Sequence, residues 1–126
     1  MTDLQHSSTD EQTSVRELKQ VVEQFVDERN WHRFHTPKNL VMSLAIETAE
    51  LMEHFQWLTA EQSLHVMDDP DTRLAVSEEV ADCLAYLLAM ANKLDIDLAT
   101  TLHAKMIRNA VKYPVEGNKF SGENAS

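Results

Sequence analysis

Two pairs of acidic residues are the part of this sequence most able to do chemistry. Glu47-x-x-Glu50 and Glu79-x-x-Asp82 each place two carboxylates on one face of a helix. At about 100° per residue, Glu47 falls inside a stripe of leucines and Glu50 borders it, while Glu79 and Asp82 lie beside a second apolar face. Burial penalises a charged carboxylate, so such positions are seldom acidic unless the group is paired or binds a metal.

Antiparallel packing of the two helices would bring these four carboxylates together. Two unit charges 4 Å apart repel by roughly 4 kcal/mol at an effective dielectric constant of 20, so either some of the groups are protonated or cations lie between them. An all-oxygen ligand set suits Mg²⁺, with Mn²⁺ as an alternative. One Glu-x-x-Glu motif alone is typical of a solvated helix face, but two motifs that border apolar stripes favour a metal site.

A di-iron site of the ferritin type is the competing metal centre, and it requires Glu-x-x-His on two helices. None of the six histidines has that spacing; His54, for example, follows Glu50 by four residues. The sequence therefore favours hard-metal chemistry over di-iron chemistry.

Aromatic, cationic and amide residues occur around the acidic motifs. The segment from Trp31 to Asn39 precedes the first acidic helix, and Trp57 ends it. Two tryptophans near a metal site could stack on a nucleobase, although large aromatic side chains are also ordinary core residues. Three polar residues extend the apolar stripe of the last helix: Lys105, Asn109 and Tyr113. Lys105 and Asn109 could bind phosphate oxygens; a lysine whose alkyl chain covers apolar surface is the alternative.

The elements that must position these residues are helices. Glycine is absent from residues 1–116, which excludes a glycine-rich phosphate loop and disfavours hairpins. Helix-start signals precede five segments, at about 14–30, 37–58, 59–62, 70–94 and 97–113. We therefore expect an all-α fold, an antiparallel four-helix bundle with a short extra helix. Its domain should cover residues 14–114, between flexible segments at 1–13 and 115–126.

The composition is that of one globular domain with a strongly negative charge. Of the 126 residues, 11 are Lys or Arg and 21 are Asp or Glu, which gives a net charge of −10. This charge opposes attraction to nucleic-acid phosphates and anionic lipid, so we expect neither polymeric nucleic acid nor a membrane as partner. With Cys83 as the single cysteine and no apolar run near ~20 residues, we expect a cytoplasmic protein.

Two features predict that several copies of the chain assemble. On helix 37–58, Met42, Ile46 and Ala49 lie outside the leucine stripe, so this helix is apolar on two sides and needs a second partner surface. On helix 70–94, a strip of small residues permits close approach of another helix: Ala81, Ala85 and Ala89. The alternative for the alanines is an exposed face built from good helix formers.

Taken together, these residues resemble the MazG-like family of all-α nucleoside triphosphate pyrophosphohydrolases, and within it the dCTP pyrophosphatase group. Around the two acidic motifs, the residues that carry the resemblance in order and spacing are Trp31 to Asn39, Glu53, Phe55 to Trp57, Glu78, Tyr86, Lys105, Met106, Asn109, Tyr113 and Pro114. The resemblance covers about Val15 to Pro114 and is far more specific than the acidic motif alone. Lys38 departs from the group, which carries arginine there, and lysine lacks the bidentate fork.

The resemblance implies a set of site residues and an assembly. Mg²⁺ would bind at Glu47, Glu50, Glu79 and Asp82. A deoxycytidine pocket would involve Trp31, His35, Asn39, Trp57 and Tyr86, and phosphate or sugar contacts would come from Lys38, Lys105, Asn109 and Tyr113. The assembly would be a homotetramer, a dimer of dimers, with sites shared across subunits.

The expected function is Mg²⁺-dependent hydrolysis of a (deoxy)nucleoside triphosphate, dCTP or a modified dCTP, to the monophosphate and pyrophosphate. Glu50 is the candidate for orienting or deprotonating the attacking water, and Glu53, displaced from the stripe, is less suited. The resemblance implies a role in nucleotide-pool sanitation. Two alternatives stay open: a related enzyme acting on dUTP, phosphoribosyl-ATP or another nucleotide, and a non-catalytic helical interaction protein.

Overall fold

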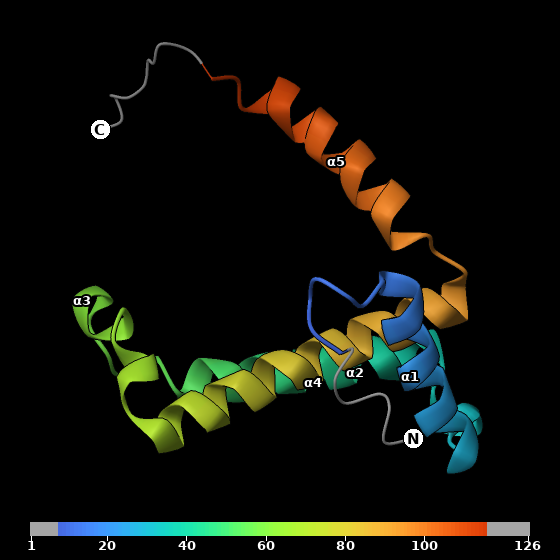
Figure 1. Cartoon of the computed structure of the whole chain (residues 1–126), viewed down its shortest axis with the longest axis horizontal. Helices are drawn as coiled ribbons and strands as arrows, with labels where there is room; N and C mark the ends of the chain where they lie inside the picture. The colour runs from blue at the N-terminus through green and yellow to red at the C-terminus, as the bar shows by residue number, and fades with distance from the viewer. Residues whose placement is uncertain (1–7, 116–126) are drawn as a thin grey trace. The chain divides into compact units, whose positions relative to one another are not determined.

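Helices make up the regular structure of residues 8–115, the part of the chain that the computed structural model describes, and no strand occurs there. The elements in chain order are α1 (Val15–Glu28), the 3₁₀ turn η2 (His32–Phe34), α2 (Pro37–Glu53), α3 (Ala60–Ser63), the 3₁₀ turn η3 (Val66–Asp68), α4 (Pro70–Leu94) and α5 (Leu98–Lys112) (Figure 1). The expected all-α class is confirmed. Of the expected flexible ends, residues 1–7 and 116–126 lie outside the described residues.

The helices begin where the sequence predicts, because a side chain caps each N-terminus. Ser14 forms a capping box with Glu17, and Thr59 forms one with Gln62. The remaining caps accept a hydrogen bond from the backbone N–H three residues on: Thr36 before α2, Asp69 before α4 and Asp97 before α5.

α1 ends at Glu28, slightly before the predicted end, because the chain adopts a Schellman motif. Asn30 has a left-handed backbone with φ of 58°. Its N–H donates to the carbonyl oxygen of Asp27, and the N–H of Trp31 donates to that of Val26, both at 3.0 Å. This reversal turns the chain so that Trp31 comes back against the end of the helix.

α2 ends at Glu53, five residues before the predicted end at Leu58. The backbone N–H groups of Phe55 and Gln56 both donate to the carbonyl oxygen of Met52 at 2.9 Å. Residues 54–57 therefore form turns, and Trp57 is not part of the helix that carries the first acidic pair.

Residues 8–95 form one compact unit, in which α2 and α4 run antiparallel and α1 packs against α4 (Figure 1). These are three of the four long helices of the predicted bundle. The buried apolar residues of this unit are Val26, Leu40, Val76, Leu88, Ala89 and Ala91. The side-chain amide of Asn92 donates to the carbonyl oxygen of Lys19 at 3.0 Å and so ties α4 to α1.

The alanine strip of α4 has a partner within the same chain. Ala89 is buried and Ala85 is half-buried, and both lie where α1 packs on α4. Ala85 and Ala89 thus face α1 of the same chain, and the predicted contact of the strip with another copy stays a prediction. Ala81 is exposed.

Residues 96–115 belong to a second compact unit, which contains α5. The side chain of Asp97 caps this helix by accepting from the N–H of Thr100 at 2.9 Å. Within residues 8–115, no helix has both the length and the apolar character needed to cross a bilayer.

Candidate active site

Three of the four predicted metal ligands meet where α2 crosses α4. Each of Glu47, Glu50 and Glu79 contributes one carboxylate oxygen to a group whose members all lie within 4.8 Å of one another. Opposite ligands of an octahedral Mg²⁺ bound at about 2.1 Å are about 4 Å apart, so this spacing fits such an ion. Among residues 8–115, no other group of acidic, histidine or cysteine side chains has this spacing, and the group contains no histidine.

The carboxylates of the cluster repel one another, and this repulsion raises the pKa values of two of them. The charge of Glu79 raises the pKa of Glu50, with smaller contributions from partial burial and from Asp82. Partial burial raises the pKa of Glu79, and the hydrogen bond and charge of Glu47 add to the effect, while a hydrogen bond with Glu50 opposes it. Like charges brought together in this way are stabilised either by protons or by a cation.

One oxygen of the cluster is buried without a hydrogen-bond partner. Within the described residues, this unpartnered side-chain oxygen is Oε1 of Glu79. Buried polar atoms are normally hydrogen-bonded, and an exception needs an explanation such as an ion. The oxygen-only donor set and this atom together fit a divalent cation of the hard class.

A cavity of about 320 Å³ lies between α1, the η2 region and α4. This volume is at the lower end of the range of small-molecule sites. Val22 and Phe25 of α1 form part of its apolar lining, and Trp31, His35 and Tyr86 supply its aromatic rings. The cavity is therefore suited to a flat, partly polar ring.

The rings of the cavity follow one another from α1 to α4. Phe25 and Trp31 meet edge to face with centroids 5.5 Å apart. The centroid of His35 lies 6.0 Å from that of Trp31 and 6.4 Å from that of Tyr86. Burial lowers the pKa of His35, and the charge of Lys93 adds to the effect. The neutral imidazole that results can donate one hydrogen bond and accept another.

Asp82 joins the cavity to the carboxylate cluster. It lies on α4 three residues after Glu79 and four before Tyr86, and its side chain is part of the cavity lining. Its charge also contributes to the raised pKa values of Glu50 and Glu79. A ligand in the cavity would therefore extend towards the cluster at the position of Asp82.

Three further predicted residues of this unit lie outside the cavity lining. The side-chain amide of Asn39 donates to the carbonyl oxygen of Phe34 at 2.9 Å, which fastens η2 to the first turn of α2. Lys38 is exposed, and Trp57 is 85% exposed. Their predicted contacts with a substrate stay predictions.

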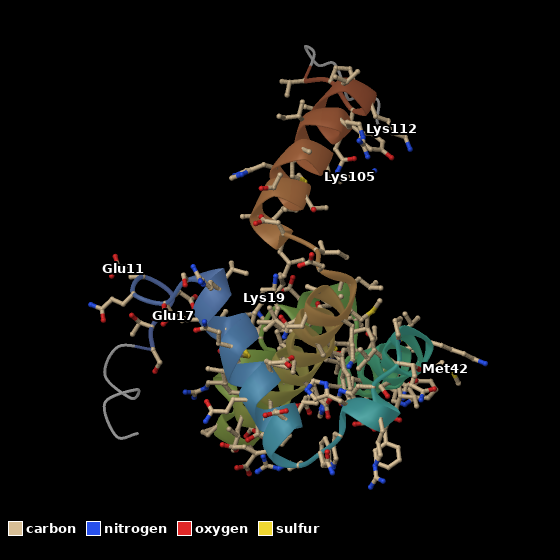
Figure 2. All side chains as sticks on the ribbon, turned by 90° about the vertical axis from the view of Figure 1, so that its right-hand side faces the viewer. Glu11, Glu17, Lys19, Met42, Lys105 and Lys112 are labelled. Carbon is tan, nitrogen blue, oxygen red and sulfur yellow. The ribbon has the colours of Figure 1, made fainter. Side chains whose placement is uncertain are left out.

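The remaining predicted residues belong to the unit that contains α5. Lys105, Asn109 and Tyr113 recur at intervals of four and share one side of the chain there, with Lys105 labelled in Figure 2. The side-chain amide of Asn109 donates to the sulfur of Met106 at 3.6 Å, and the backbone N–H of Tyr113 donates to the carbonyl oxygen of Asn109. Their role in binding phosphate or sugar also stays a prediction.

Sequence reasoning missed the contribution of α1 to the cavity. Val22 and Phe25 fit the apolar stripe of that helix, and such a stripe looks the same whether it covers a core or a cavity. The available signal was Trp31, because a large ring placed just after a helix end often packs back on the preceding turn.

Comparison with known proteins identifies the family of this chain. Residues 42–125 match the MazG-like family. The chain is 35% identical to dCTP pyrophosphatase 1 of Bos taurus over 108 residues, which is 86% of this chain and 64% of that protein. It is 36% identical to dCTP pyrophosphatase 1 of Homo sapiens over 101 residues, which is 80% of this chain and 59% of that one. The chain thus spans less than two thirds of the length of these relatives.

A solved structure of a pyrophosphatase has the same fold as this chain. The crystal structure of a pyrophosphatase from Archaeoglobus fulgidus superposes with a TM-score of 0.73 at 39% sequence identity, and the match covers 79% of this chain and 91% of that one. Sequence and fold agree with the resemblance drawn from the acidic motifs, and the chain belongs to the MazG-like family.

Proposed function

We propose that this protein hydrolyses a (deoxy)nucleoside triphosphate between the α and β phosphorus atoms and releases the nucleoside monophosphate and pyrophosphate. The observation that carries the proposal is the position of Asp82, which adjoins both the carboxylate cluster and the aromatic cavity. One end of such a substrate is a flat base, and the other is a chain of phosphates that needs a cation. The names of the relatives, dCTP pyrophosphatase 1 and a pyrophosphatase, support the same reaction.

Glu47, Glu50, Glu79 and Asp82 would hold Mg²⁺, or Mn²⁺ in its place. The cation would neutralise phosphate charge and lower the pKa of the attacking water. Glu50 is the exposed member of the cluster, so it is the carboxylate best able to accept a proton from water. Catalysis then consists mainly of positioning and charge stabilisation.

We propose dCTP, or a dCTP modified on its base, as the substrate. Trp31 and Tyr86 would contact the faces of the pyrimidine, and neutral His35 would hydrogen-bond to its edge. Lys38, Asn39, Trp57, Lys105, Asn109 and Tyr113 are assigned to substrate contacts on the family resemblance. The physiological role would be control of the nucleotide pool in the cytoplasm.

We further propose that the protein works as a homo-oligomer, a tetramer arranged as a dimer of dimers. Met42 and Ile46 of α2 are 54% and 58% exposed, and Figure 2 shows Met42 projecting outward from its helix. Contiguous apolar surface of this kind marks an interaction site in a soluble protein. A second copy of the chain would cover it, as the two-sided apolar pattern of α2 predicts.

The test is a panel of canonical and base-modified dNTPs and NTPs incubated with Mg²⁺, with products identified by chromatography. We expect dCMP and pyrophosphate from dCTP, and no turnover in chelator. Preference for dUTP or another nucleotide would support the reaction and overturn the substrate. Absence of Mg²⁺-dependent pyrophosphate release from every nucleotide would favour the non-catalytic interaction protein instead.

A further inference from the structure

A chain of three polar side chains lies behind the aromatic wall of the cavity. Nζ of Lys93, near the end of α4, is 3.0 Å from Nδ1 of His32 in η2. On the other side of the same ring, Nε2 of His32 is 3.2 Å from Oε2 of Glu23 on α1, and Oδ1 of Asp27 lies 3.7 Å away. The side chain of His32, in the η2 turn that follows α1, therefore contacts both α4 and α1.

The chemistry of lysine sets the direction of the hydrogen bond between Lys93 and His32. An ammonium group can only donate, so Nδ1 of His32 accepts from Lys93. An imidazole that accepts at Nδ1 carries its ring proton on Nε2, the atom that faces the carboxylate of Glu23 at 3.2 Å. The ring of His32 is thus held between a donor on α4 and a negative charge on α1.

His32 occupies the turn that separates the two aromatic residues of the cavity wall. Trp31 precedes it directly, and His35 follows with its N–H donating to the carbonyl oxygen of His32 at 3.1 Å. The N–H of Phe34 donates to the carbonyl oxygen of Trp31 at 2.8 Å in the same turn. An anchor on the His32 ring therefore constrains Trp31 and His35 together.

The anchor is separate from the surface that would touch a ligand. Lys93, His32 and Glu23 are absent from the lining of the large cavity and border a small recess behind it, with His35 shared between the two. The recess has a volume of about 10 Å³, which is room for roughly one water molecule. A side chain that borders only the small recess can affect a nucleotide in the large cavity only through the residues between them, Trp31 and His35.

We propose that Lys93 is a positioning residue that, through His32, holds Trp31 and His35 in the arrangement that binds the base of the nucleotide. The effect of this role on KM rests on the proposed function, because it requires the protein to hydrolyse a nucleotide. It predicts that the network sets affinity for the nucleotide and leaves the chemistry at the carboxylate cluster unchanged.

The first experiment measures KM and kcat for dCTP at saturating Mg²⁺. In Lys93→Met, which keeps an unbranched side chain one atom shorter and removes its charge and donors, we expect KM to rise about tenfold and kcat to stay within about twofold. Lys93→Arg retains a donor and a charge and should restore most of the affinity. Arg16→Met removes one positive charge from α1 outside the network and should behave as wild type.

His32→Ala is the second variant, because it removes the ring that accepts the hydrogen bond from Lys93. Its KM should rise as in Lys93→Met, and the double variant should add little to either single change. An additive double variant, or equal falls in kcat and kcat/KM, would overturn the positioning role. A Lys93→Met variant with wild-type KM would overturn it as well.

A measurement without substrate separates this inference from the proposed function. Hydrogen exchange of the amides in residues 32–35 should be faster in Lys93→Met than in the wild type, Lys93→Arg or Arg16→Met, because the turn loses its anchor. Failure of the wild type to hydrolyse any nucleotide would overturn the proposed function alone. Exchange at the wild-type rate in Lys93→Met would overturn the anchor whatever the activity.

Discussion

Glu50 of α2 and Glu79 of α4 face each other closely enough that the charge of Glu79 is the largest cause of the raised pKa of Glu50. The two helices thus pack with repulsion concentrated at one point of their contact, and the buried, unpartnered Oε1 of Glu79 belongs to that point. Repulsion retained at one place in a fold commonly marks a functional site. A divalent cation would remove it.

The stability of the metal-free protein should depend on pH through this pair. Both pKa values lie above the ordinary value of 4.5, so between that value and the raised pKa values the folded state binds more protons than the unfolded state. The free energy of unfolding contributed by Glu50 and Glu79 therefore falls as pH rises through this window. Since Mg²⁺ competes with protons, it should raise Tm by roughly 5 °C near pH 7.5 and by less near pH 5.

Differential scanning fluorimetry with and without Mg²⁺ measures this effect. Glu79→Gln should abolish the Mg²⁺-dependent increase in Tm, whereas Glu61→Gln, an exposed change on α3, should retain it. An increase of equal size in both variants would place the cation elsewhere.

Loss of any one of the proposed metal ligands Glu47, Glu79 and Asp82 should stop turnover without unfolding the protein. Glu47→Gln, Glu79→Gln and Asp82→Asn each remove one negative ligand, so we expect kcat/KM for dCTP to fall more than about 100-fold. Far-UV circular dichroism should stay that of a helical protein, since the change relieves repulsion. Retained activity in all three variants would refute the assigned site.

Loss of either tryptophan should weaken nucleotide binding and leave metal binding unchanged. Trp31→Ala removes a ring from the cavity lining, and with stacking worth about 1–3 kcal/mol per base, KM should rise about 5- to 150-fold. Trp57→Ala, at a position 85% exposed in the single chain, should also weaken nucleotide binding if a neighbouring subunit completes the site. Calorimetry with a non-hydrolysable dCTP analogue and with Mg²⁺ alone checks both variants. An equal loss of metal binding would contradict a role in base stacking.

Assembly should depend on the exposed apolar side of α2. Ile46→Glu puts a charge on the surface that we assign to a subunit contact, so light scattering should detect a smaller species than the tetramer proposed for the wild type. Glu61→Gln serves as the control, and helical content should be unchanged in both. A wild-type protein that is monomeric at micromolar concentration would rule out the proposed assembly.

The helix starts and the carboxylate cluster were predictable because both depend on short-range rules. A cap such as Ser14 or Asp69 acts on the next three residues, and the spacing of Glu47 and Glu50 fixes their face of the helix. The crossing of α2 and α4 then needs only antiparallel packing to bring Glu79 to them.

The helix ends and the cavity were harder to predict because they depend on contacts between elements. The Schellman motif at Asn30 uses a residue type that also occurs inside helices, so periodicity alone extends α1 as far as Asn30. Ala85 and Ala89 permit close approach but do not say which element faces them, and in the structure both border the cavity between α4 and α1 of the same chain. The Lys93–His32 contact joins residues 61 positions apart, beyond any local pattern.

The left-handed backbone of Asn30 limits which amino acids related sequences and redesigned variants can carry there. Glycine, asparagine and aspartate tolerate that torsion, whereas valine, isoleucine or threonine would strain it and misdirect the indole that follows. A mutant library that varies the aromatic lining of the cavity to accept a new base should therefore keep Asn30. A residue that cannot adopt the left-handed torsion there would displace Trp31 and inactivate variants whose lining is otherwise suitable.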